Sequence, residues 1–227
     1  MREVLCVQVR VWLVLRREAC FALSRSTLAI SRARDLELRV VSRNEDNVGV
    51  VLFNTVQSPV DDVRVRRALQ LSTNQEALIK ASLGAGAGER ATQWFSRESR
   101  WWSSLAAEAW PDLDEAAAKE LLAAYINDED RSDRRTPGSK ISVDLQCTDD
   151  IHLSSMTREL SRQWEATGLV EVEIETVTRS GLIQRVLGSI TDRPGFSGDF
   201  VATCWRVGGE SDPAMMFGPV FGPIRAS

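Results

Sequence analysis

The residues between 141 and 205 switch repeatedly between two hydrophobic periods, and this constrains the fold more than any other feature of the sequence. Three segments alternate apolar and polar residues as strands do, namely 141–147, 170–177 and 199–205. Two segments between them have apolar residues at helical spacing, namely 151–167 and 180–187. Strand, helix, strand, helix and strand in such a short stretch predict an α/β unit with a partly parallel sheet.

The upstream part of the chain predicts one more strand and a long helix. An apolar run over 48–53 is typical of a largely buried strand, and Pro59 follows it. Asp61 and Asp62 then supply N-cap candidates and first-turn acids. We therefore expect a helix over 62–82.

The middle of the chain predicts another helix between two irregular segments. Asp112 and Glu115 fit a capping box that opens an Ala- and Leu-rich helix over 113–125. Four of the seven tryptophans lie between 92 and 110, where we expect them to pin an irregular loop onto the core. The Arg-rich run 131–135 includes an acid and is interpreted as a solvated loop.

Composition and charge exclude several function classes. The 227-residue chain is 43% hydrophobic and 26% charged, which is the ordinary globular range. Its formal charge of −4, with basic residues scattered among acids, gives no footprint for nucleic acid. We see no apolar stretch long enough to span a membrane. Residues 1–15 are interrupted by charges and do not resemble an export signal.

Catalytic and metal motifs are poorly supported. His152 is the single histidine, and the four cysteines are too widely spaced for a zinc knuckle or a redox pair. There is no Gly-x-Ser-x-Gly motif, and the Gly-rich stretch 83–88 lacks the Lys-Ser/Thr of a phosphate loop. A hydrolase that uses Glu210 and Asp212 has no nucleophile or metal set to support it. We expect no enzyme, no metal and no cofactor.

One candidate site follows from the position of a tryptophan. Trp205 lies at the carboxyl end of the last predicted strand, where ligands gather in open α/β sheets. Arg206 can pair with a carboxylate, and Glu210 or Asp212 can hold an ammonium or a hydroxyl group. A core role for Trp205 is an equally open alternative, because tryptophan is highly buried on average.

Several motifs resemble the family 5 extracellular solute-binding proteins, which serve peptide, nickel and oligosaccharide ABC importers. Val-Leu-Phe-Asn-Thr at 51–55, Pro59, and Asp-Val-Arg-Val-Arg-Arg-Ala-Leu at 62–69 resemble the family pattern FN…P…D-x-R-V-R-x-A-L. Ala-Lys-Glu-Leu-Leu at 118–122 resembles its A-K-x-L-L helix. The stretch from 199 to the Asp-Pro pair at 212–213 resembles its D-x-D…W…D-P segment. The resemblance covers about residues 22–221.

The resemblance implies a lobe like that of type II periplasmic binding proteins, with a mixed, partly parallel sheet flanked by helices. Residues 1–21 are then an atypical or truncated start, and 22–227 form a second lobe that is incomplete at the C-terminus. The implied ligand-binding residues are Phe53, Asn54, Thr203, Cys204, Trp205, Arg206, Glu210 and Asp212. In the peptide binders of this family an acid soon after the tryptophan holds the peptide amine, whereas this chain has Gly208 there.

The function expected from this resemblance is solute capture without chemistry, by closure of two lobes. The solute would be an oligopeptide, a sugar or a similar small polar molecule, and the partners would be the permease subunits of an ABC transporter. The full-length protein would be periplasmic or extracellular and membrane-associated. Two alternatives stay open, namely a solute-sensing effector domain of a transcription regulator and a non-functional fragment.

Overall fold

The fold is built on one four-stranded mixed sheet. A computed structural model describes residues 27–41, 47–84, 88–188 and 198–208. The strand order is β1-β4-β2-β3. The strands are β1 (Asn47–Phe53), β2 (Ile141–Thr148), β3 (Val170–Val177) and β4 (Ala202–Gly208). β1 is antiparallel to β4, whereas β2 is parallel to both β3 and β4. The predicted α/β class with a partly parallel sheet is confirmed.

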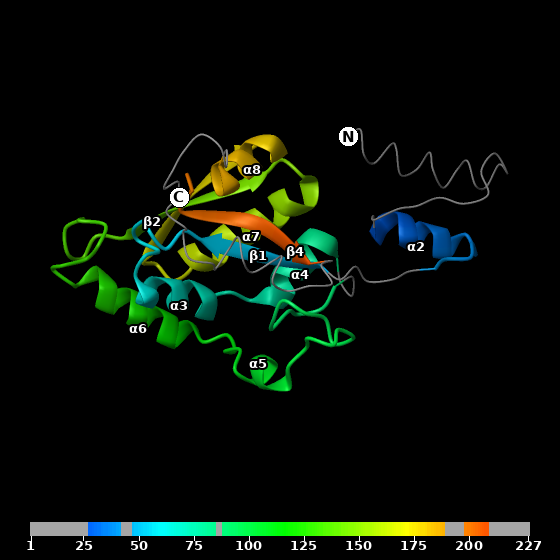
Figure 1. The fold of residues 1–227 in the computed structure, drawn as a ribbon, viewed down its shortest axis with the longest axis horizontal. Coiled ribbons are helices and arrows are strands. Elements are labelled where there is room, and N and C mark those ends of the chain that lie inside the picture. Colours follow the sequence, from blue (N-terminus) through cyan, green and yellow to red (C-terminus); the bar gives the residue numbers. More distant parts are fainter. Residues whose placement is uncertain (1–26, 42–46, 85–87, 189–197, 209–227) are drawn as a thin grey trace, which may run out of the picture.

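Helices cover both faces of this sheet. The described helices are α2 (Thr27–Asp35), α3 (Val63–Leu71), α4 (Gln75–Leu83), α5 (Ser104–Glu108), α6 (Glu115–Ile126), α7 (Ile151–Glu165) and α8 (Arg179–Leu187), and α2 and α5 lie away from the sheet (Figure 1). In Figure 1, α8 lies above the sheet, and α3 and α6 lie below it. α7 packs on β2 and β3, α4 packs on α7, and α3 packs on α6. None of the described helices is long and apolar enough to cross a membrane.

The core lies between the sheet and α7. Val143 and Leu145 of β2 and Leu160 of α7 are almost fully buried there. Trp164 of α7 is 1% exposed, and its indole Nε1 donates to the carbonyl of Leu69 at 3.1 Å. Because burial of each such side chain is worth about 1.5–3 kcal/mol, this apolar layer is what holds α7 on the sheet.

The helix predicted over 62–82 is wrong in one respect, because it is two helices. α3 ends at Leu71, and α4 begins at Gln75. Asn74 is the N-cap of α4. Its side chain accepts from the backbone amide of Ala77 at 3.0 Å, and its backbone amide donates to Gln163 Oε1 at 2.7 Å. These bonds give the backbone partners outside a continuous helix, so the chain turns here.

The helix after the Trp-rich segment begins later than predicted. The N-cap of α6 is Asp114, whose carboxylate accepts from the amide of Ala117 at 2.9 Å. Asp112 is therefore not the cap, and it forms an ion pair with Arg90 at 2.8 Å instead. The predicted capping box is wrong, because Asp114, two residues after Asp112, directly precedes the first residue of α6 and caps it instead.

The interpretation of 131–135 as a solvated loop is wrong for Arg131, whereas Arg134 and Arg135 are exposed. Arg131 is 3% exposed, and its guanidinium forms a bidentate pair with Asp133 at 2.6 and 2.7 Å. It also lies over the ring of Tyr125, 5.1 Å from the centroid. A charge buried in this way is tolerated only when it is paired and hydrogen-bonded, as it is here.

The four tryptophans between 92 and 110 do not enter the buried core. Trp101 is 45% exposed, and the other three are half-buried. Guanidinium groups cover two of the rings: Arg100 lies over Trp101 at 4.9 Å and Arg97 over Trp102 at 5.7 Å. The segment therefore packs partly on itself, and the expectation that its tryptophans pin it to the core is only partly met.

Candidate functional site

The candidate site lies at the edge of the sheet formed by the carboxyl end of β2, where β4 continues past its pairing with β2. The register pairs Leu145 with Ala202 and Gln146 with Thr203, and Trp205 follows two residues later on β4. Trp205 is half-buried, and Arg206 is exposed. Ligands of open α/β sheets bind outside this edge. The prediction that Trp205 lies at the carboxyl end of the last strand is wrong, because β4 continues to Gly208 and Trp205 is its fourth residue.

Two of the expected ligand-binding residues use their side chains to hold β4 in place. Thr203 is fully buried, and its hydroxyl donates to the carbonyl of Gln146 at 3.0 Å. Cys204 is disulfide-bonded to Cys147 of β2, and its Sγ lies 3.6 Å from Thr157 Oγ1 of α7. Because side chains alternate along a strand, Cys204 faces α7, whereas Thr203 and Trp205 face the opposite side.

Phe53 and Asn54 lie at the other end of the sheet. Phe53 is level with Ala202, which places it about 13 Å from Arg206 at about 3.3 Å per residue. The Phe53 ring lies against the Trp164 ring, with 6.2 Å between the centroids. The structure does not bring these two residues next to Trp205.

Asn54 has a buried position with partners inside the fold. Its Nδ2 donates to the carbonyl of Gly198 at 3.2 Å, and its Oδ1 accepts from the amide of Val56 at 3.4 Å. Its own amide donates to the carbonyl of Val201 at 2.9 Å. Asn54 therefore ties the end of β1 to the segment that enters β4. Glu210 and Asp212 lie outside the described residues.

Acidic residues follow β2 at the same edge as Arg206. Asp150 Oδ1 accepts from the amide of Leu153 at 3.1 Å and so caps α7. Asp149 is exposed. An aromatic face with a guanidinium and a carboxylate nearby can bind a small polar solute that carries either charge.

The sheet face that carries Trp205 also has an ion pair near this edge. Arg185 of α8 donates to Glu175 of β3 at 2.5 Å. This bond is the main reason why the pKa of Glu175 lies below its ordinary value. Glu175 therefore stays ionised at neutral pH, and its ion pair with Arg185 helps to hold α8 on this face of the sheet.

The described residues contain no group of three or more His, Cys, Asp and Glu side chains that could hold a metal ion.

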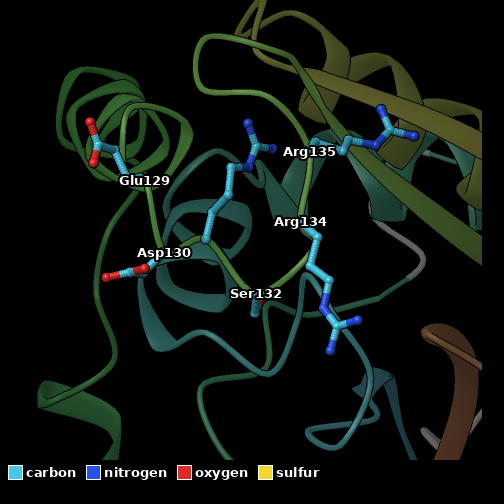
Figure 2. A pocket seen from close by; sticks show the side chains of 6 residues that line it. Glu129, Asp130, Ser132, Arg134 and Arg135 are labelled. Carbon is cyan, nitrogen blue, oxygen red and sulfur yellow. The ribbon is translucent and has the colours of Figure 1, made fainter.

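A polar hollow elsewhere on the surface is not part of this edge. It is lined by Glu129, Asp130, Arg131, Ser132, Arg134 and Arg135. These residues belong to the connection from α6 to the first residue of β2, at the opposite end of the strand from Thr148. Figure 2 shows the two acids pointing to one side and Arg134 and Arg135 to the other, so no single charge gathers there.

Sequence reasoning missed the Cys147–Cys204 disulfide. The two cysteine Cα atoms are 5.1 Å apart, although 57 positions separate the residues in sequence. Each cysteine lies within or next to a predicted strand, but only the order and register of the strands bring them together. That register cannot be read from the two segments separately.

Comparison with known proteins connects this fold to one family. The family model described as "Bacterial extracellular solute-binding proteins, family 5 Middle" matches residues 7–223. No curated protein matches the chain.

Three solved structures are similar in fold. The oligopeptide-binding protein AppA from Bacillus subtilis, in complex with a nonapeptide, is 18% identical with a TM-score of 0.65 over 88% of this chain and 39% of its own. The Escherichia coli murein tripeptide binding protein MppA is 17% identical, with a TM-score of 0.63 over 88% of this chain and 37% of its own. NikA from Staphylococcus aureus, in complex with Ni(L-His)2, is 18% identical, with a TM-score of 0.54 over 78% and 34%. The chain thus spans less than half the length of each of these proteins.

Proposed function

We propose, from the premise that the chain belongs to the family 5 bacterial extracellular solute-binding proteins, that it forms one wall of a solute-binding cleft. In a two-lobed protein this wall would capture a solute by closure of the lobes and pass it to the permease subunits of an ABC importer, without chemistry. The observation that carries the proposal is the family match over 7–223 on a lobe in which Trp205 and Arg206 follow the pairing of β4 with the parallel strand β2.

We propose a peptide-like solute first. Two of the similar structures are named for oligopeptide and murein tripeptide binding. A peptide offers flat amide groups and apolar side chains to an aromatic ring, and a free carboxylate to a guanidinium, and Trp205 and Arg206 supply both partners. Asp149 would face the amine from the neighbouring strand end. In this proposal Thr203, Cys204, Phe53 and Asn54 support the wall, and Glu210 and Asp212 would follow at its rim.

Export from the cytosol is part of the same proposal. A buried Cys147–Cys204 disulfide supports it, because such bonds persist in the periplasm and outside the cell and are rare in reducing compartments. The family is named for extracellular proteins, which agrees with this compartment.

The test is a titration of the ¹⁵N-labelled chain with trialanine, observed at the indole N–H signals. We expect the Trp205 signal, identified with Trp205→Phe, to shift, and the signal of buried Trp164 to stay. Trp205→Ala should weaken binding by about tenfold or more, as for a central aromatic contact. Trp101→Ala is the matched control, because Trp101 is exposed on a different segment and should bind trialanine unchanged.

Two results would count against this proposal. Trialanine that shifts no indole signal would refute peptide recognition at this edge. Equal binding by the chain and by Trp205→Ala would refute the assignment of Trp205. A parallel titration with the nickel–histidine complex separates the two solute classes, and a response to that complex alone would overturn the choice of peptide.

A further inference from the structure

The sheet consists of two strand pairs that meet at a narrow seam. β1 and β4 pair over their whole lengths, from Asn47 opposite Gly208 to Phe53 opposite Ala202. β2 and β3 also pair over their whole lengths. Between β2 and β4, however, the register holds at two positions only, Leu145 with Ala202 and Gln146 with Thr203. The contact between the two halves of the sheet is therefore short.

Two side-chain links reinforce this seam. The Thr203 hydroxyl donates to the carbonyl of Gln146 across it, at 3.0 Å. At the next position of the register, Cys147 and Cys204 form the disulfide, and each is 3% exposed. Beyond the disulfide, the described part of β4 pairs with β1 alone. The disulfide is therefore the last covalent link between β2 and β4 before Trp205.

Trp205 is the first residue after this last link. It points to the face opposite the disulfide, so its ring does not pack against the sulfurs. Its distance from Thr148 and Asp149 depends on how closely β4 follows β2 at this point. We propose that the Cys147–Cys204 disulfide is a positioning element, which holds the Trp205 end of β4 against the carboxyl end of β2.

The covalent step is the oxidation of two thiols. The Cys147 and Cys204 thiols lose two protons and two electrons as the S–S bond forms. An external disulfide accepts these protons and electrons by thiol–disulfide exchange and is reduced to a dithiol. Because the bond is buried under Thr157 and the α7 layer, it forms during folding and then resists exchange in the native state. It therefore acts as a permanent cross-link between β2 and β4 at the site.

The position of Trp205 can be tested without any solute, whereas its importance for binding rests on the proposed function. The test uses the ¹⁵N-labelled chain with Cys6→Ser and Cys20→Ser, so that Cys147 and Cys204 are its only thiols. Indole N–H signals are compared before and after reduction, at a temperature where circular dichroism is unchanged. We expect the Trp205 signal to shift or broaden and the Trp164 signal to stay, since the Trp164 indole is bonded to Leu69.

A second variant keeps the proposal testable if the reduced chain unfolds. Cys147→Val with Cys204→Ala fills the space with apolar side chains but makes no bond. We expect it to remain folded while its Trp205 signal resembles that of the reduced chain. A Trp205 signal that is unchanged by reduction, or restored by this variant, would overturn the positioning role. So would a purified chain in which alkylation and mass spectrometry find both thiols free.

Discussion

The buried Arg131–Asp133 pair allows a quantitative test of the structure. The Arg131 side chain is 0% exposed and that of Asp133 is 9% exposed. Besides its two bonds to Asp133, the guanidinium donates from Nη1 to the carbonyls of Ile126, Thr136 and Ser139, at 3.3, 3.3 and 2.8 Å. It thus joins the end of α6 to the start of β2.

Asp133→Asn keeps the shape of the side chain and removes its charge. The guanidinium then stays buried without a counter-charge, which costs about 3–5 kcal/mol when one partner of a buried pair is removed. A domain is stable by only about 5–15 kcal/mol, so this is a large part of the total. With a urea m-value of about 2 kcal/mol/M, the unfolding midpoint should fall by about 1.5–2.5 M.

Asp128→Asn is the matched control in the same loop. Asp128 pairs with Arg64 at 2.9 Å, but the two side chains are 34% and 31% exposed. A surface pair of this kind is worth about 0–1 kcal/mol. Urea unfolding followed by circular dichroism measures both variants. Equal midpoint shifts for the two aspartates would refute the argument from burial.

Two further predictions concern pH and backbone conformation. Arg162 is the main reason why the pKa of Glu159 falls from its ordinary 4.5 to about 2. The stabilisation is therefore complete above pH 4.5 and is lost as the pH falls towards 2, so Glu159→Gln should flatten the fall in the urea midpoint between pH 5 and pH 3. Parallel slopes would contradict this. Gly198 has φ +94°, and an added Cβ would lie 2.6 Å from the Phe200 ring, so Gly198→Ala should cost about 1–3 kcal/mol. Gly49→Ala, with nothing within 4 Å of the new Cβ, is the control and should not destabilise the chain. Urea unfolding measures both glycine variants.

The strands were predictable because each is half or fully buried along its length. β3 alternates Val170 and Val172 with exposed glutamates, and its predicted bounds agree with the structure. β4 was placed a few residues early, because Phe200 continues the apolar pattern while the backbone pairing begins at Ala202. Period-2 patterns report burial, whereas strand ends depend on pairing partners.

The errors in the helices have a common cause, which is competition by polar side chains for backbone bonds. The helical spacing of apolar residues on both sides of 72–74, such as Leu69 and Leu78, favours one helix, although 72–74 themselves are Ser, Thr and Asn. The hydroxyl of Thr73 donates to the carbonyl of Leu69 at 2.6 Å, and Asn74 caps α4. Which of these bonds form depends on Gln163 and Trp164 of α7, far away in the sequence. Local propensity alone cannot decide such a case.

The candidate site was predictable in part for a similar reason. That Trp205 lies on the last strand could be inferred from the pattern around it, but its position in the middle of β4 could not, because the strand bounds depend on pairing with β1. The distance between Phe53 and Trp205 could not be inferred either, because β1 runs antiparallel to β4 and places Phe53 opposite Ala202, at the start of β4. The burial of Arg131 was also hidden, since its three carbonyl partners come from both sides of an irregular loop.

The exposure of the candidate site indicates what a complete cleft has to add. Arg206 and Asp149 are exposed, so both charges are solvated and a solute on this wall alone competes with water for each of them. Association also costs several kcal/mol of lost translational and rotational freedom, so a solute should bind this wall alone only weakly. A second wall that closes over Trp205 would remove that water and strengthen both charged contacts in a lower dielectric. In the proposed function, this wall would therefore set which solute fits, and the affinity would depend on the lobe that closes against it.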